Sequence, residues 1–347
     1  MGNVIAYSGL STKVKAMTSK FIDETDFQEI VQMTSVPQVV SYLKKTSGYQ
    51  NSLASVDETT LHRGDIERLL KKTIFNDFSK LYHFSNLEQR KFLRLYFKRY
   101  EILFIKSCMR VTFSQDNEYI DDFSPYIEFF HHHTKLDIER LPQSKTIDEL
   151  VSLLKGTDYY QPLSKLENRS RAMIFDYGMA LDLHYFSHIW KAKDRFFSGE
   201  DLTVVKEAYG GKFDLINVQW IQRSKQYYHM LPADIYALLI PVYAKLKKEQ
   251  VTSLVEAPTM EEFYELLSKT YYGQRYSEFE LLTLEEFYNF LLRHLLESLS
   301  RKHPNSVAIL YNYMYHKEHE IDRLTTAIEC VRYGVEPEEA MSYIRKN

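Results

Sequence analysis

Histidine clusters are the residues of this chain whose spacing comes nearest to a metal site. His131 to His133 are consecutive, and consecutive side chains on a helix point about 100° apart, so three such residues cannot converge on one ion without other ligands. His316 and His319 lie three residues apart, beside Glu318 and Glu320. Their sequence, HKEHE, is not the HExxH of a zinc protease, and no cysteine accompanies it. We therefore expect solvated or capping histidines and no bound metal.

Other catalytic patterns are also missing from the sequence. The nearest approach to a phosphate-binding loop is GGKF at residues 210–213, which lacks the required glycine spacing and the hydroxyl that would hold magnesium. No Gly-x-Ser-x-Gly elbow and no cysteine–histidine arrangement is present. The sequence therefore predicts a protein that is not an enzyme and has no catalytic residues, cofactor or metal of its own.

Composition indicates a soluble globular chain of 347 residues, 44% hydrophobic and 26% charged. A net charge of −3 gives no global basic field for binding nucleic acid or an anionic membrane. The two cysteines, Cys108 and Cys330, form no cluster, which favours free thiols in a reducing compartment. No apolar run reaches the roughly 18 residues that span a bilayer. We expect a cytoplasmic protein, or one that reaches a membrane through a partner.

One stretch of sequence occurs three times, at Val36 to Leu53, Thr146 to Leu163 and Thr259 to Tyr276. The copies start 110 and 113 residues apart, a spacing that suits a small domain better than a solenoid unit. Aligned without gaps, they share the columns Val40, Leu150 and Phe263; Leu43, Leu153 and Leu266; Ser47, Thr157 and Thr270; and Tyr49, Tyr159 and Tyr272. The repetition predicts one module in three copies.

Each copy is followed by a pair of long apolar-striped segments that read as helices. The predicted helices cover residues 65–84 and 87–109, then 169–197 and 200–228, then 278–301 and 305–333. Almost no segment alternates with a period of two, so we expect an all-α fold. We place the three helical modules at residues 1–120, 121–231 and 232–347, with short junctions that favour close packing of the modules.

A second match between the modules lies within the long helices. An acidic residue is followed by an aliphatic one at Glu101-Ile102, Asp214-Leu215 and Glu320-Ile321. This pattern is weaker than the opening stretch, but it extends the repeat to the whole module. The basic residues between Arg90 and Arg99 form one face of a predicted helix and are expected to be a solvated surface.

Local signals near the first copy predict how its helices begin and end. Thr25 or Asp26 is expected to cap the segment FQEIVQMT, and Pro37 suits the first turn of the repeat helix, where its missing N–H is not needed. Gly48 is expected to end that helix, one residue before the first repeated tyrosine.

The repeated tyrosines Tyr49, Tyr159 and Tyr272 are the candidate partner-binding residues. Three equivalent rings could line a surface where the modules meet. Alternatively, each ring closes the core of its own module, with the hydroxyl reaching water. The sequence leaves both interpretations open.

The pattern resembles the C subunits of the A/V-type ATP synthases, the homologues of the d subunit of the eukaryotic vacuolar proton pump (the AC39 family). The resemblance rests on the threefold repeat and on the ending Glu320 to Leu324 followed by Ile328 to Gly334. The stretches Tyr7 to Phe21 and Asp214 to Asn217 also look like family features. It covers nearly the whole chain.

The resemblance implies a funnel of three modules around a pseudo-threefold axis. Its narrow side would sit on the cytoplasmic face of the membrane proteolipid ring, and its open side would receive the central shaft. The protein would be a non-catalytic rotor component of the central stalk, present in one copy, that transmits torque between ATP turnover and proton or sodium transport. It would touch the membrane only through the ring and bind no nucleic acid.

Two further hypotheses come from other classes of protein. One is a free-standing helical-repeat scaffold that binds protein partners in a groove. The other is a metal-dependent hydrolase that uses the histidine clusters.

Overall fold

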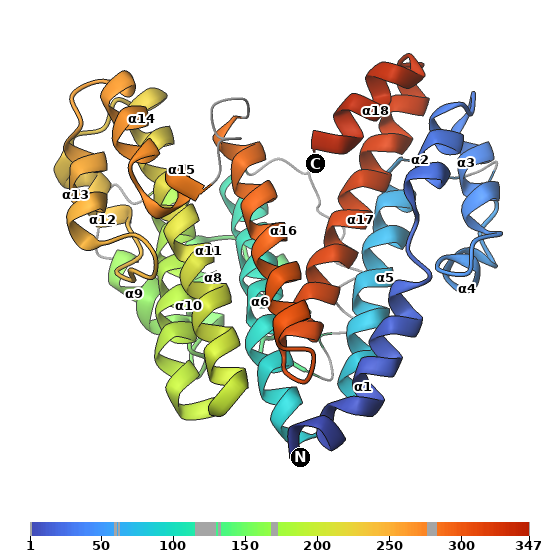
Figure 1. Ribbon diagram of the computed structural model, residues 1–347, viewed down its shortest axis with the longest axis horizontal. Helices are drawn as coiled ribbons and strands as arrows, with labels where there is room; N and C mark the ends of the chain where they lie inside the picture. The colour runs from blue at the N-terminus through green and yellow to red at the C-terminus, as the bar shows by residue number, and fades with distance from the viewer. Residues whose placement is uncertain are drawn as a thin grey trace. The chain divides into compact units, whose positions relative to one another are not determined.

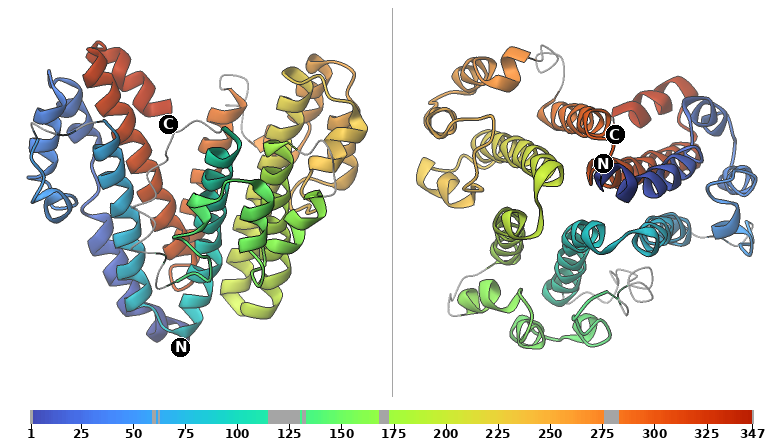
Figure 2. Two further views of the ribbon diagram at one scale, coloured as in Figure 1. Left: turned by 180° about the vertical axis from the view of Figure 1, so that it is seen from behind. Right: turned by 60° about the horizontal axis from the view of Figure 1, so that its bottom comes forward.

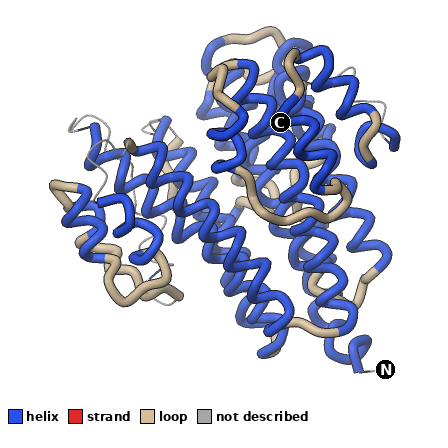
Figure 3. Tube along the Cα trace, turned by 90° about the vertical axis from the view of Figure 1, so that its left-hand side faces the viewer, coloured by secondary structure: helices blue, strands red, loops and turns tan. Residues whose placement is uncertain are grey.

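A computed structural model describes residues 2–58, 61, 63–114, 130, 133–167, 173–275 and 283–346. All regular secondary structure in these ranges is helical, and they contain no strand (Figure 3). The predicted all-α class is confirmed. The histidines at positions 131 and 132 lie outside the described residues, and so do residues 115–129, which include the predicted boundary between the first two modules.

Six long helices form at the predicted places. They are α5 (Arg63–Phe84), α6 (Leu87–Ser114), α10 (Ile174–Phe196), α11 (Gly199–Gln226), α16 (Leu284–Lys302) and α17 (Ala308–Tyr333). The predicted bounds of these helices agree with the observed bounds to within about five residues. The exceptions are the helix starts predicted at 169 and 278, which cannot be compared because residues 168–172 and 276–282 lie outside the described ranges. Apolar residues spaced for one helix face therefore located these elements reliably.

Each copy of the repeated stretch folds into a short helix, a turn and a second short helix. The pairs are α3 (Val36–Leu43) with α4 (Gln50–Leu53), α8 (Ile147–Leu153) with α9 (Tyr160–Glu167), and α14 (Met260–Ser268) with α15 (Tyr271–Arg275). The repeated tyrosine lies at the start of the second helix in every copy. The remaining helices are α1 (Gly2–Thr18), α2 (Glu24–Val31), α12 (Pro232–Leu238), α13 (Lys248–Glu256), α18 (Pro337–Lys346) and the 3₁₀ turn η1 (Leu141–Gln143).

The chain divides into two compact units, and the boundaries fall inside α6 and α16. Unit 1 contains the described residues up to Leu93 and from Ser300 onward, and unit 2 contains those from Arg94 to Leu299. The three-module division and the pseudo-threefold axis stay predictions.

Unit 1 is built around α17. This helix packs against α1, α2, α3, α5 and α18, so the last long helix of the chain is surrounded mainly by the first helices (Figures 1 and 2). Aromatic side chains fill the contacts: the ring of Phe21 stacks on Tyr313 with centroids 5.2 Å apart, and Phe92 lies 5.7 Å from Tyr311. The many aromatic residues therefore serve helix packing, as large rings bury much area for each contact.

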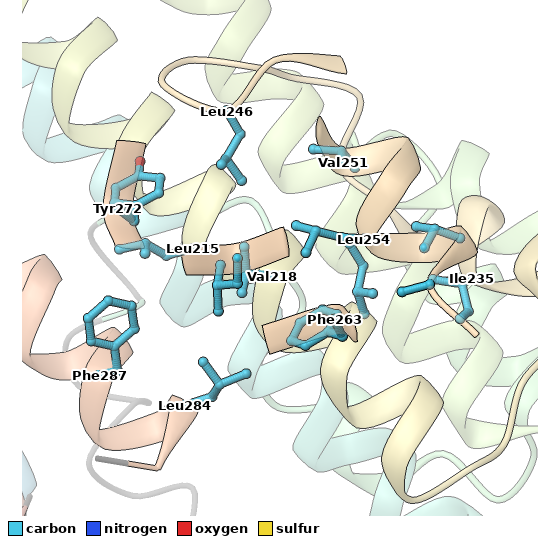
Figure 4. Packing of buried hydrophobic residues seen from close by; sticks show 14 of the residues in the cluster. Leu215, Val218, Ile235, Leu246, Val251, Leu254, Phe263, Tyr272, Leu284 and Phe287 are labelled. Atoms are coloured by element: carbon cyan, nitrogen blue, oxygen red, sulfur yellow. The ribbon is translucent and has the colours of Figure 1, made fainter. Parts of the chain in front are cut away.

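Unit 2 is built around α11, which packs against α10, α12, α13 and α14. Its core cluster draws on α11, α13, α14 and α16 (Figure 4). Leu215 and Val218 of α11 meet Leu254, Phe263 and other apolar residues there, all nearly inaccessible to solvent. The cluster also contains the ring of Tyr272, which fixes the third copy of the repeat to α11.

The local predictions near the first repeat were partly wrong. The cap of α2 is Asp23, which accepts a hydrogen bond from the Asp26 N–H while the Asp26 carboxylate accepts one from the Asp23 N–H. Pro37 does lie in the first turn of α3, as predicted. That helix ends at Leu43, well before Gly48. A Cβ at Gly48 would lie 2.5 Å from the carbonyl oxygen of Lys20, so close backbone approach is what requires glycine there.

Candidate functional site: three buried tyrosine–carboxylate pairs

The first pair joins Tyr49 to Glu320, in unit 1. The tyrosine side chain is fully buried, and its hydroxyl donates a 2.7 Å hydrogen bond to Oε2 of Glu320. Oε1 of the same carboxylate accepts a 2.6 Å bond from the backbone N–H of Ile22. The pair therefore connects the first repeat, the segment before α2 and the helix α17.

A buried lysine completes this first cluster. Lys317, only 2% exposed, donates hydrogen bonds of 2.6 Å to Glu320 and 3.0 Å to the Tyr49 hydroxyl. Its ammonium also lies 4.4 Å from the centre of the Tyr49 ring, within cation–π range. Burial, followed by the charge of Glu320, raises the pKa of Tyr49 well above its ordinary value, so the phenol stays protonated and keeps donating.

The second pair joins Tyr159 to Glu101, in unit 2. The Tyr159 hydroxyl donates a 2.5 Å bond to Oε2 of Glu101, and the Thr134 hydroxyl donates to Oε1. Burial raises the pKa of the Glu101 carboxyl, although both hydrogen bonds act to lower it. Beside the pair, Lys98 forms a 2.7 Å ion pair with Asp158. Among the described residues, the hydroxyls of Tyr159 and Thr134 are the groups that donate to this carboxylate, and no lysine or arginine donates to it.

The third pair joins Tyr272 to Asp214, also in unit 2. The Tyr272 hydroxyl lies 3.1 Å from Oδ2 of Asp214. The same carboxylate accepts backbone N–H bonds from Ala244 at 3.1 Å, Lys245 at 2.6 Å and Leu246 at 3.0 Å. Burial nevertheless raises the pKa of Asp214. Three backbone donors take the place that a lysine has in the first cluster.

The three pairs share one geometry. In each, the repeated tyrosine at the start of a short helix reaches an acid in the middle of a long helix. In the second and third pairs the tyrosine follows its acid by 58 residues. In the first pair the acid lies 271 residues after the tyrosine, so residues from the two ends of the chain meet. The sequence showed both repeated columns, and the constant spacing of 58 was the signal that could have paired them.

These clusters are suited to fixing the helices in place. The three tyrosine rings are buried, and their hydroxyls bond to carboxylates, whereas the core interpretation had them reaching water. Satisfied polar networks in an interior hold helices in one register, since every other arrangement leaves a buried group unpaired. The assignment of Tyr49, Tyr159 and Tyr272 to partner contact stays a prediction.

The structure accounts for the other candidate residues named from the sequence by local packing. His316 and His319 both lie against the ring of Tyr315, at centroid distances of 5.6 and 6.1 Å. Within the described ranges, no group of three metal-binding side chains lies close enough to hold an ion. Gly210 and Gly211 lie inside α11, where an added Cβ would meet Ala244 or Leu295 at 2.7 Å. Helix packing explains this glycine pair.

Basic residues on the predicted solvated face of α6 also hold neighbouring elements. Arg90 donates 2.8 Å and 3.2 Å bonds to the carbonyls of Tyr82 and His83, at the end of α5. Lys91 pairs with Glu88 on its own helix. The cysteines Cys108 and Cys330 are buried, and neither forms a disulfide within the described residues.

No helix in the described part of the chain is both long and apolar enough to cross a membrane. The fold and the clusters define an all-helical protein of repeated units, in which equivalent buried pairs fasten each repeat to a long helix.

Comparison with known proteins places this architecture in one family. The family described as ATP synthase (C/AC39) subunit matches residues 10–343. The A-type ATP synthase C subunit of Methanosarcina mazei is 26% identical over 341 residues, covering 96% of this chain and 91% of that protein. The A-type ATP synthase C subunit of Thermococcus kodakarensis is 21% identical over 346 residues, covering 97% of this chain and 90% of that protein. The chain belongs to the ATP synthase C/AC39 subunit family.

Proposed function

We propose that this protein is the non-catalytic central-stalk component that couples the shaft of an A/V-type ATPase to its membrane proteolipid ring. The observation that carries the proposal is membership of the ATP synthase C/AC39 subunit family over residues 10–343. The protein turns with the rotor, in one copy, and passes torque between ATP turnover and the transport of protons or sodium ions. It lies on the cytoplasmic face and touches the membrane through the ring.

The buried clusters support a role that needs stiffness. A coupling must resist twisting, and torque is lost wherever one helix can slide along another. The tyrosine–carboxylate pairs oppose such sliding, because moving either partner leaves a buried polar group unsatisfied. The tie between Tyr49 and Glu320 is the most useful of the three for this purpose, because it joins an early repeat to the last long helix. We propose that the three repeats are arranged around one axis as a funnel.

The chemistry of the chain supports a mechanical role. The three acids that the modules share already accept hydrogen bonds from other groups of the chain. The donors are tyrosine and threonine hydroxyls, a lysine and backbone N–H groups, and the acceptors are Glu320, Glu101 and Asp214. We propose that catalytic and ion-carrying carboxylates belong to other subunits of the complex.

Co-purification tests the proposed function. The tagged chain is expressed with the complete ATPase, solubilised in mild detergent at low salt, and recovered through the tag. Recovery of both the proteolipid ring and the shaft subunits is expected. The double variant Lys317→Met/Tyr49→Phe should recover less of both, since it loosens α17, while Lys269→Ala, on an exposed ion pair with Glu265, serves as the control. Recovery of neither partner by the native chain would refute the proposal and favour a free-standing scaffold.

A further inference from the structure

An exposed apolar surface lies at one end of unit 1, where the first turns of α1 meet the turn between α5 and α6 (Figure 1). It consists of four large side chains that we call the apolar tip: Val4 at 55% exposure, Ile5 at 78%, Phe84 at 53% and Leu87 at 73%. The Gln89 side chain donates a 2.9 Å hydrogen bond to the carbonyl of Ala6, which joins α6 to α1. A Cβ added at Gly9 would lie 3.6 Å from the ring of Phe84, so that ring lies beside α1. Apolar side chains gathered in this way mark interaction sites, unlike the single ones scattered over any surface.

The turn that carries two of these side chains has a fixed backbone. The backbone N–H groups of Asn86 and Gln89 each donate a 3.0 Å bond to the side-chain oxygen of the other residue. The guanidinium of Arg90 donates to the last carbonyls of α5. Phe84 and Leu87 are therefore presented in one arrangement before any partner arrives, which lowers the entropy lost on binding.

The apolar tip carries no charge. Residues 2–12 of α1 include no charged side chain. The exposed hydroxyls of Ser8 and Thr12 donate to carbonyls of their own helix. At the start of α6, Glu88 forms a 2.7 Å ion pair with Lys91. A partner that brought a charged side chain to this surface would remove it from water without giving it a counterpart, so the surface fits an uncharged apolar partner.

The turns of the other two long-helix pairs lack such a surface. Between α10 and α11, Phe197 is only 7% exposed. The exposed residues of that turn, from 195 to 199, are Arg195, Ser198 and Gly199. Those of the turn between α16 and α17 are Arg301, Lys302 and Pro304. The repeated fold therefore forms this turn without exposing large apolar side chains, and the apolar tip is a special feature of the first pair.

We propose that the apolar tip is the surface through which this protein binds the membrane proteolipid ring, so that the first of its three long-helix turns carries the contact. Proteolipid helices span the bilayer with about 20 apolar residues each, and their ends pass through a zone enriched in aromatic side chains. The shaft fits less well, because helices that stand in water carry charged side chains on their outer faces, and these would be desolvated on the tip. The inference rests on the proposed function and names the surface that makes one of its two contacts.

Binding to the purified ring tests this surface. The ring is reconstituted in nanodiscs, and the dissociation constant of the full chain is measured by biolayer interferometry at low and high salt. Ile5→Ser/Leu87→Ser changes the two most exposed residues of the tip and should weaken binding at least tenfold. Ile5→Leu/Leu87→Ile keeps the apolar character and should bind within twofold of the native chain. High salt should not weaken native binding, since salt screens charges and not apolar contacts.

Matched controls change the other two turns. Arg195→Ser and Lys302→Ser each alter an exposed residue of one turn and should change ring binding less than twofold. If either weakens binding as much as the serine variant of the tip does, the contact is spread over several turns and the inference is wrong. Melting temperatures verify that all variants fold.

The remaining results separate this inference from the proposed function. If the native chain binds the ring and the serine variant binds it equally well, the inference is wrong and the proposed function stands. If the native chain does not bind the ring, both fall.

Two other occupants of the tip are tested with the same proteins. Nanodiscs of the same lipids without the ring should not bind the native chain, and equal binding to them would assign the tip to lipid. Sedimentation of the native chain alone should show a monomer, and a dimer that the serine variant loses would assign the tip to a second copy. Either result would overturn the inference.

Photo-cross-linking in the intact ATPase gives an independent answer. With p-azidophenylalanine in place of Leu87, mass spectrometry should find a cross-link to a proteolipid subunit. A cross-link only to the shaft would contradict the assignment.

Discussion

The hydroxyl of Tyr49 lies 2.7 Å from Oε2 of Glu320, although 271 positions of the chain separate the two residues. The equivalent residues in the other two pairs are 58 positions apart. In the second and third pairs, a long helix therefore binds the repeat that follows it in the chain, whereas the last long helix, α17, binds the first repeat. The C-terminal region is thus an integral part of the structure around the N-terminal repeat, and removing α17 should expose the buried Tyr49 to solvent.

Removal of the buried lysine should destabilise unit 1 strongly. Lys317→Met leaves the Glu320 carboxylate buried without a cation, and breaking such a pair costs about 3–5 kcal/mol. The double variant Lys317→Met/Glu320→Gln removes both charges and keeps an acceptor for the buried N–H of Ile22, so it should cost clearly less than the single change. Hydrogen exchange of α17 and thermal melting followed by circular dichroism measure the effect. Equal destabilisation by the single and double variants would mean that the lysine contributes packing and not charge pairing.

Amide substitutions should separate the two carboxylates of unit 2. Glu101 accepts from two hydroxyls, which can also act as acceptors, so Glu101→Gln can rebuild both bonds and should cost under about 1 kcal/mol. Asp214 accepts from three backbone N–H groups, which only donate, so the amide NH₂ of Asp214→Asn must face a donor at a cost of about 2 kcal/mol.

Tryptophan fluorescence can follow the unfolding of the Glu101→Gln and Asp214→Asn variants, since Trp190 and Trp220 both lie in unit 2. Urea unfolding of the two variants under identical conditions gives the two free energies. An Asp214→Asn variant as stable as Glu101→Gln would show that the backbone N–H groups find other acceptors.

The stability of unit 2 should depend on pH through Glu101. Burial raises the pKa of this carboxyl above its ordinary value of 4.5, so the folded protein holds the proton more tightly than the unfolded chain. The resulting stabilisation is complete below the ordinary pKa and is lost as pH rises through the raised one. The unfolding free energy of the native chain minus that of Glu101→Gln should therefore fall from pH 4.5 toward neutral pH. Asp214 titrates in both proteins and cancels; a difference that rises with pH would contradict the raised pKa.

The sequence predicted the helices well, because their apolar stripes depend only on local spacing. It also singled out both halves of the buried clusters, as the tyrosine column and the acid–aliphatic column. It did not predict the pairing of Tyr49 with Glu320, since contacts between the two ends of a chain leave no local pattern. Nor did it identify Lys317, because a single lysine in a helix is usually solvated and nothing marks this one as buried.

Local end signals were less reliable than the stripes. Glycine is the residue type that most often ends a helix, so Gly48 was predicted to end α3, but that helix ends at Leu43. Glycine is required at position 48 because the backbone of Lys20 lies close to it, and a rule for helix ends does not detect such a contact. The sequence predicted Thr25 or Asp26 as the cap of α2, but the cap is Asp23. Asp23 and Asp26 form a reciprocal capping box, and only the backbone conformation shows which of the two acids is the cap.

Alanine substitution at two glycines of unit 1 should have opposite effects. In Gly48→Ala the new Cβ would lie 2.5 Å from the Lys20 carbonyl oxygen, a backbone atom, so one segment must move at a cost of about 2 kcal/mol or more. Gly64→Ala, near the start of α5, meets nothing within 4 Å and should stabilise the helix by about 0.5–1 kcal/mol. Thermal unfolding of both variants measures these changes.

Movement at Gly48 should also disturb the neighbouring Tyr49 bond to Glu320, and a mutant cycle can detect this coupling. Once Gly48→Ala has displaced the turn, part of the hydrogen bond is already lost, so adding Tyr49→Phe should cost less than it does in the native chain. The cycle with Gly64→Ala is the control and should be additive, because a Cβ added at that site meets no other atom within 4 Å. Additivity in both cycles would show that the turn relaxes without moving Tyr49, and the strain at Gly48 would then be independent of the tie between the two ends of the chain.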